Sequence, residues 1–174
     1  MRRLLSRPAL VVAISLVFIH SASGGTHLGA TIEDFQSAWG RPTIEERVDR
    51  TARFVWGRYD QTTKLPLGVS EAQVQFLDDV ACAVLLRGRL GVHEKWSWVA
   101  KHIRQVMLDC PQSLPLPGRN SSGSREFSLK DGTFVAVRQF KDRTIIVING
   151  PVLLQNEEVF SRELAKIYRP KAEQ

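Results

Sequence analysis

Residues 74–86 read VQFLDDVACAVLL, and the two adjacent carboxylates in the middle of this stretch are compatible with two folds. In a hairpin, Asp78 and Asp79 belong to the turn and the apolar residues alternate along the two strands. In a helix, residues 70–73 form a capping box and the apolar residues recur at intervals of three and four. Intrinsic propensity favours the helix.

The same turn layout occurs twice more in the chain. LKDGT (129–133) and FKDRT (140–144) match FLDDV (76–80), each with an apolar first residue, aspartate third and a β-branched residue fifth. LKDGT is a strong hairpin signal because Asp-Gly separates two alternating apolar runs. This repetition favours the hairpin, with a three-residue loop after which Val80 and Cys82 share the apolar face.

Either fold directs the two carboxylates to solvent rather than to a shared site. Successive carboxylates in a strand face opposite ways, whereas a catalytic pair must converge. We therefore expect no catalytic role for Asp78 and Asp79. In the hairpin, Gln73 and Gln75 turn away from the apolar face.

Metal chemistry has little support in the pattern. His93-Glu94 begins like a zinc-protease motif, but Ser97 occupies the place of the second histidine, and His102 faces half a turn away. Two cysteines and four histidines do not provide the spacing of a structural zinc site. We predict no metal and no cofactor.

The first 24 residues are typical of a secretory signal peptide. Three arginines precede an apolar stretch at 9–19, and small residues follow at 22–24. The apolar stretch is too short to cross a bilayer core of about 30 Å, and no cysteine near the cleavage site allows lipid attachment. We expect cleavage after Gly24, a periplasmic or secreted bacterial location, and no stable membrane anchor.

Signal cleavage changes the interpretation of the charge. The full chain has 24 basic and 18 acidic residues, and residues 1–24 hold three of the basic ones and no acidic one, which leaves a net charge of +3. The arginines of 41–58 alternate with acidic residues, as on a solvated surface. We therefore expect no nucleic-acid partner.

Cys82 and Cys110 are the two cysteines of the chain. Disulfides persist in exported proteins, so we predict that these two cysteines are paired. The alternative is two buried free thiols, because free cysteine is among the most buried residue types.

The remaining pattern predicts a single α+β domain over residues 25–170, with a tail at 171–174. The fold class that we expect is an antiparallel meander sheet packed by two or three helices. The expected strands are 51–59, the two strands of the hairpin, 125–129, 133–140 and 144–149. Residues 111–124 form a loop by composition.

Three helices are expected. The first covers 31–39, where Thr31 and Asp34 resemble a capping box, and the second covers 93–109. The third begins at Asn156 as N-cap, and its apolar stripe consists of Phe160, Leu164, Ile167 and Tyr168.

Trp98 lies off the apolar stripe of the 93–109 helix and shares its side with His102. An exposed tryptophan is a common anchor in protein interfaces. We therefore predict Trp98 and His102 as partner-binding residues. The alternative is that loop 111–124 or the C-terminal helix covers Trp98.

Three segments carry a resemblance to known exported bacterial proteins: TIEDFQSAWGRP (31–42), the strand at 54–56 and the hairpin at 76–84. Over about residues 31–110 the order of elements resembles the outer-membrane assembly lipoprotein called small protein A and the β-lactamase inhibitory proteins. The resemblance implies a non-catalytic module that offers a sheet face or a loop to another protein. This chain departs from the assembly lipoprotein because it lacks the lipid-bearing cysteine.

Together these features predict an exported, non-catalytic protein-interaction module, either an inhibitor or an assembly factor. The alternative function is a small secreted hydrolase with an unrecognised site. Convergent titratable side chains in a cleft would favour the hydrolase, and an exposed apolar patch would favour the binding module.

Overall fold

The computed structural model describes residues 25–57, 63–88, 95–114, 116–121, 123–158 and 161–162. The predicted signal peptide (1–24), the tail (171–174) and the apolar stripe of the predicted C-terminal helix lie outside the described residues.

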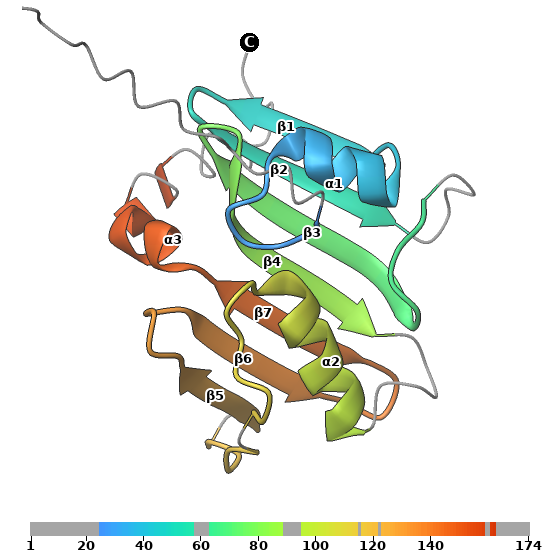
Figure 1. Ribbon diagram of the computed structural model, residues 1–174, viewed down its shortest axis with the longest axis vertical. Coiled ribbons are helices and arrows are strands. Elements are labelled where there is room, and N and C mark those ends of the chain that lie inside the picture. The colour runs from blue at the N-terminus through green and yellow to red at the C-terminus, as the bar shows by residue number, and fades with distance from the viewer. Residues whose placement is uncertain are drawn as a thin grey trace, which may run out of the picture.

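The described residues form seven strands and three helices (Figure 1). In chain order they are α1 (Ile32–Trp39), β1 (Ile44–Val48), β2 (Thr51–Gly57), β3 (Val69–Leu77), β4 (Val80–Gly88), α2 (Trp96–Val106), β5 (Ser124–Ser128), β6 (Phe134–Gln139), β7 (Thr144–Asn149) and α3 (Pro151–Gln155).

The strands build one antiparallel sheet in the order β1-β2-β3-β4-β7-β6-β5. This order contains two meanders, each preceded by a helix, and the last strand of the first meander pairs with the last strand of the second. The predicted α+β class with an antiparallel sheet is confirmed.

The stretch 74–86 is a hairpin, as its turn layout predicts, and not a helix. Its turn is shorter than the predicted three-residue loop, because Leu77 pairs directly with Val80. Asp78 and Asp79 both adopt left-handed backbone, with φ of 51° and 63°. Two left-handed residues give a type I′ turn, whose twist matches that of the strands on either side.

A β-bulge corrects the predicted facing of Val80 and Cys82. Gln75 pairs with Ala83 and Phe76 with Ala81, so Cys82 is the extra residue of β4. As a result Ala81 joins the core cluster with Phe76, whereas Val80 is 41 % exposed.

The bulge is also the point where β4 changes its neighbour. Before it, Ala81 exchanges backbone hydrogen bonds with Gly29 and Ala30, at 2.8 and 2.9 Å. At the bulge, the Cys82 carbonyl oxygen accepts a hydrogen bond from the Gly150 N–H at 2.8 Å. After it, β4 pairs with β7. A Cβ atom at position 150 would lie 3.0 Å from that carbonyl oxygen, so the close approach favours glycine.

One core lies between the helices and one face of the sheet. Figure 1 shows α1 and α2 on the same side of the sheet, and their buried residues belong to the same hydrophobic cluster as alternate residues of the strands. Under α1, this cluster contains five aromatic rings with neighbouring centroids 4.9 to 6.0 Å apart: Phe35, Trp39, Phe54, Trp56 and Phe76.

The expected elements correspond closely to the described ones, with two differences. Thr31 and Asp34 form the predicted capping box, and β5, β6 and β7 fall within one residue of the predicted strands. The strand β1 was not expected. A short helix that was not expected, α3, begins at Pro151 and has Asn156 as its C-cap. Helical residues 157–158 follow Asn156 directly, so its role as N-cap of the C-terminal helix stays a prediction.

Candidate functional site

The sheet face opposite the core runs across the strands of a seven-stranded sheet. Because side chains alternate along a strand, the residues between the core positions all point to this other side. We call this surface the open face, and the strand registers arrange it into three rows that run across the sheet.

The middle row is largely aliphatic. Its members are paired in register from one edge of the sheet to the other: Ile44, Val55, Gln73, Leu85, Val147, Ala136 and Glu126. Leu85, Val147 and Ala136 are partly exposed although they lie in the interior of the sheet.

The two flanking rows are more polar. The row that contains Glu71 consists of Gly57, Glu71, Arg87, Ile145, Arg138 and Ser124. The row that contains Asn149 consists of Glu46, Arg53, Gln75, Ala83, Asn149, Phe134 and Ser128. An aliphatic band with polar flanks is the usual composition of a protein-binding surface.

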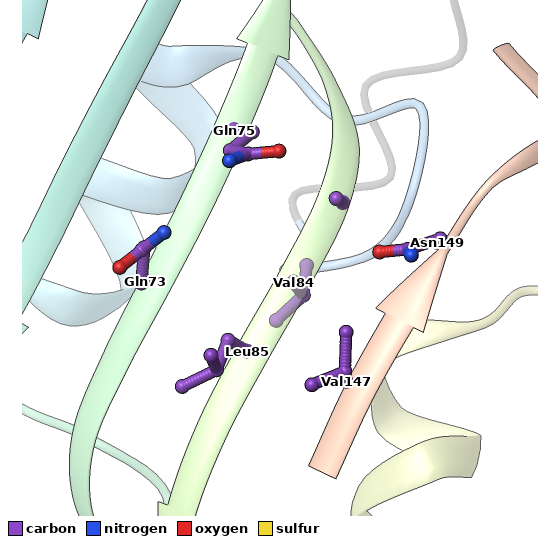
Figure 2. Close-up of a pocket in the computed structure, with 7 residues that line it drawn as sticks. Gln73, Gln75, Val84, Leu85, Val147 and Asn149 are labelled. Carbon is purple, nitrogen blue, oxygen red and sulfur yellow. The ribbon is translucent and has the colours of Figure 1, made fainter. Parts of the chain in front are cut away.

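A hollow lies on the open face where β3, β4 and β7 meet. Figure 2 shows Gln73 and Gln75 on β3, Leu85 on β4, and Val147 and Asn149 on β7 around it. The amides of Gln73, Gln75 and Asn149 both donate and accept hydrogen bonds, and the aliphatic groups supply an apolar floor. This set of groups is suited to recognising a surface by hydrogen bonding and apolar contact.

A second hollow adjoins the first over β5, β6 and β7. It is lined by Ser124, Glu126, Ala136, Arg138, Ile145 and Val147. Val147 lines both hollows, so they lie next to each other on the open face.

Polar contacts order the β1–β3 part of the open face. The Arg53 guanidinium donates to Glu46 Oε2 at 2.6 Å and to Gln73 Oε1 at 3.0 Å. Arg87 lies 3.4 Å from the Glu71 carboxylate. The long polar side chains are thereby held along the sheet, where Val55 of the middle row is buried and Ile44 at the edge is 43 % exposed.

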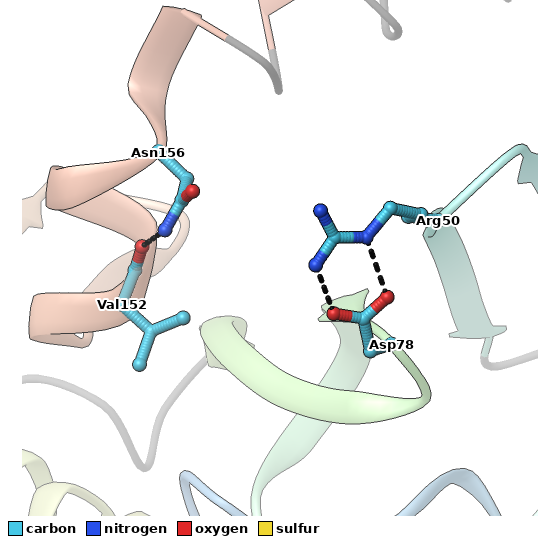
Figure 3. Close-up of polar contacts among 4 residues, drawn as sticks. All are labelled: Arg50, Asp78, Val152 and Asn156. Carbon is cyan, nitrogen blue, oxygen red and sulfur yellow. Dashed lines mark hydrogen bonds and ion pairs between the residues drawn. The ribbon is translucent and has the colours of Figure 1, made fainter.

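The two aspartates of the β3–β4 turn are bound to arginines of the β1–β2 hairpin. Asp79 pairs with Arg47 at 3.1 Å, and Arg50 donates two hydrogen bonds to the Asp78 carboxylate (Figure 3). The bonds from Arg50 lower the pKa of Asp78 below its usual value. All four side chains are more than half exposed. The contacts join the tips of two hairpins, and the lowered pKa of Asp78 favours its charged form, which is not the form that a general acid requires.

The predicted disulfide is wrong, because Cys82 and Cys110 are both free thiols. Cys82 leaves the main core at the bulge and packs with Leu77 and Leu153 in a separate small cluster, where its thiol donates to the Gln75 carbonyl oxygen at 3.2 Å. Burial raises the pKa of Cys82 to about 12. Cys110 packs against the main core instead, so the two thiols face different clusters.

The rings of Trp98 and His102 are in contact on α2, with centroids 4.1 Å apart and planes tilted by 34°. Trp98 is partly buried, and its indole N–H donates to the Leu67 carbonyl oxygen at 3.4 Å. His102 is only 2 % exposed, and its Nδ1 donates to the Trp98 carbonyl oxygen at 2.8 Å. Direct contact between a partner and His102 would therefore require this region to open. A partner-binding role for Trp98 stays a prediction.

Burial lowers the pKa of His102, although hydrogen bonds to the backbone of Trp98 and Leu67 act in the opposite direction. The neutral imidazole thus supports Trp98 from beneath. Leu67, whose carbonyl receives the indole N–H, has a side chain that is 85 % exposed.

Within the part of the chain that the structure describes, no three histidine, cysteine or acidic side chains gather where they could hold a metal ion. No helix of the described residues is long and apolar enough to cross a membrane.

Sequence reasoning did not identify the open face as a site. The alternation of Gln73 and Gln75 with apolar residues already separates the two faces of β3. The pairing of β4 with β7, which unites Leu85 and Val147 in one row, has no local signal.

Comparisons of the chain with protein-family models, with curated protein sequences and with solved structures give no match.

Proposed function

We propose that the protein is an exported, non-catalytic interaction module that binds another protein through the open face. The observation that carries this proposal is the row of partly exposed aliphatic side chains, centred on Leu85 and Val147, across the face opposite the core. Large proteins and peptides are recognised by such apolar bands with a polar rim. An inhibitor and an assembly factor would both use the face in this way.

The proposal also depends on α1 and α2 covering only one face of the sheet. α1 and α2 cover the core face, so the partner takes the side that these two helices leave available. The predicted export agrees with this role, since a binding protein of the periplasm or the medium needs neither a cofactor nor a membrane anchor.

Site-specific photo-crosslinking tests the proposal. A photoreactive amino acid is placed at Leu85 on the open face, and in a matched control at Leu108, which is 68 % exposed at the end of α2. Each variant is expressed in its native host and irradiated. We expect a discrete protein adduct from position 85 that is absent from position 108. Equal adduct patterns at the two positions, or none at position 85, would contradict the proposal.

A further inference from the structure

The charged groups of the open face are arranged in a self-complementary way. Glu71 on β3 and Arg138 on β6 lie in the same row, with Arg87 and Ile145 between them. The two residues are equally far from the line between β4 and β7, one strand beyond each of these central strands. They therefore form a symmetric pair of opposite charges about that line.

Glu126 on β5 lies diagonally opposite Arg138 on the open face and lines the same hollow, but Arg138 forms no ion pair with it. Its Nε donates to the Ser124 hydroxyl at 3.2 Å, and none of the ion pairs of the described residues includes it. Arg138 is exposed, so its guanidinium remains available to an acidic group from another molecule. Glu71 is partly exposed, and Arg87 contacts both of its carboxylate oxygens, each at 3.4 Å.

A two-fold axis parallel to the strands, on the line between β4 and β7, satisfies both groups at once. Such an axis places β4 over β7 of a second copy and β3 over its β6, while each row stays opposite the same row. Glu71 of each copy then faces Arg138 of the other, which gives two equivalent ion pairs. Isologous interfaces are built in this way, since the same patch serves both subunits.

The same axis brings apolar groups together at the centre of the face. Leu85 of one copy lies over Val147 of the other, and this contact also occurs twice. In the row of Asn149, Phe134 lies over Gln75 of the second copy. Aligned packing of two sheets in a sandwich uses this kind of contact between side chains of facing sheets.

The open face is large enough for a weak dimer. The axis leaves β1 beyond the edge of the second copy, so six strands of each copy face each other. Six strands that lie about 4.8 Å apart and each expose about 17 Å cover roughly 490 Å² of sheet. The two facing sheets would thus remove roughly 980 Å² from water, which is at the lower bound of about 1,000 Å² for a specific interface. The dimer should therefore dissociate measurably upon dilution.

We propose that the partner of the open face is a second copy of this chain, bound face to face about this axis. The inference rests on the proposed function, because it names the occupant of the same surface. The dimer depends on the Leu85–Val147 contacts at its centre and on the two Glu71–Arg138 ion pairs beside them.

Sedimentation velocity of the purified protein over a wide range of concentration tests the dimer. We expect a reversible monomer–dimer equilibrium for the wild type and a monomer for Leu85→Arg. Leu108→Arg, which adds the same charge away from the open face, should leave the equilibrium unchanged.

Charge reversal tests the orientation of the two copies. Glu71→Arg and Arg138→Glu should each weaken the dimer about tenfold, since each change turns two attractive pairs into repulsive ones. The double variant restores opposite charges and should recover most of the wild-type affinity. Both positions are accessible to solvent, and a circular dichroism spectrum like that of the wild type confirms folding.

A wild type that stays monomeric at every concentration overturns the inference. If the wild type is monomeric and Leu85→Arg is also monomeric but melts at a lower temperature, the inference is likewise overturned. That result would show that the chain itself covers the face. If the dimer affinity does not change on charge reversal at Glu71 or Arg138, the proposed two-fold axis is wrong. A photo-adduct at position 85 with a different protein would uphold the proposed function while the dimer fails.

Discussion

Two substitutions of Asp79 test the turn between β3 and β4. The difference between the two variants in the free energy of unfolding depends on the backbone conformation at position 79. Asp79 has a φ of 63°, and its carboxylate pairs with Arg47 at 3.1 Å. Asp79→Ala and Asp79→Gly both remove this ion pair, so its loss cancels when the two variants are compared with each other. What remains is the cost of placing a Cβ atom on a left-handed residue.

The expected difference follows from two opposing contributions. Left-handed backbone costs a non-glycine residue about 1–2 kcal/mol, whereas glycine loses more conformational entropy on folding, by about 0.5–1 kcal/mol. The glycine variant should therefore be the more stable of the two by roughly 0.5–1 kcal/mol. In a right-handed turn the strain is absent, and the alanine variant would instead be the more stable by about 0.5–1 kcal/mol.

Urea denaturation of the two variants under identical conditions measures this difference. A matched control is the same pair of substitutions at Asp142, in the turn between β6 and β7, where an aspartate also pairs with an arginine, at 3.1 Å, but φ is not positive. There the alanine variant should be the more stable. If alanine is also preferred at position 79, the type I′ turn is wrong.

Three further predictions concern groups buried in the core or at the bulge. The pKa of His102 is lowered in the folded state, so the stability contributed by its neutral form is complete above about pH 6.5 and is lost as the pH falls below that value. His102→Gln should remove this part of the pH dependence of the free energy of unfolding, and an unchanged pH dependence would contradict the prediction. Without reductant, a thiol reagent should label Cys110 in the native protein and Cys82 only after unfolding, given free thiols and the burial of Cys82; an intact mass without labels in denaturant would mean that the two are paired. Gly150→Ala should destabilise by about 1–3 kcal/mol through the contact with the Cys82 carbonyl, while Gly118→Ala, with no atom within 4 Å, should change the melting temperature little.

The part of the fold that the sequence predicts well is the part that local patterns determine. The Thr31–Asp34 capping box sets the start of α1, and the Asp-Gly signal near 131–132 sets the hairpin of β5 and β6. For 74–86 the local signals for a helix and for a hairpin conflict, and the resemblance of its turn to two others in the chain favours the hairpin. In each of these cases the determining contacts lie within a few residues of one another.

The strand β1 shows where such patterns fail. Its sequence, IEERV, has charged residues at three successive positions, so no alternation of apolar and polar residues marks it as a strand. It lies at the edge of the sheet, where charged side chains are common because they discourage pairing with other molecules. The core side of β1 is covered by Arg47, whose guanidinium carbon lies 5.0 Å from the centroid of the Phe54 ring.

Long-range contacts account for the remaining errors. The disulfide prediction assumed that two exported cysteines meet, but the bulge turns Cys82 toward Leu77 and Leu153, and a bulge has no dependable signal in a single sequence. The residue type of Asn156 suits an N-cap, and in the structure it stands between α3 and helical residues 157–158. Its side-chain amide donates to the Val152 carbonyl oxygen at 2.8 Å (Figure 3).

The existence of the open face follows from the symmetry of the topology. Reading outward from the centre, β4-β3-β2 mirrors β7-β6-β5, and β4 and β7 are antiparallel. The two meanders are thus related by an approximate two-fold rotation about an axis perpendicular to the sheet. Such a rotation exchanges the two halves but leaves each face of the sheet on its own side. A helix that precedes one meander on a given side must therefore have its counterpart, α2 for α1, on that same side (Figure 1). Both helices consequently contribute to one core. On the other side, α3 contacts the sheet through Leu153, which packs with Leu77 and Cys82. Leu85, Val147 and Ala136 stay partly exposed on that side, and α1 and α2 lie on the opposite side of the sheet (Figure 1).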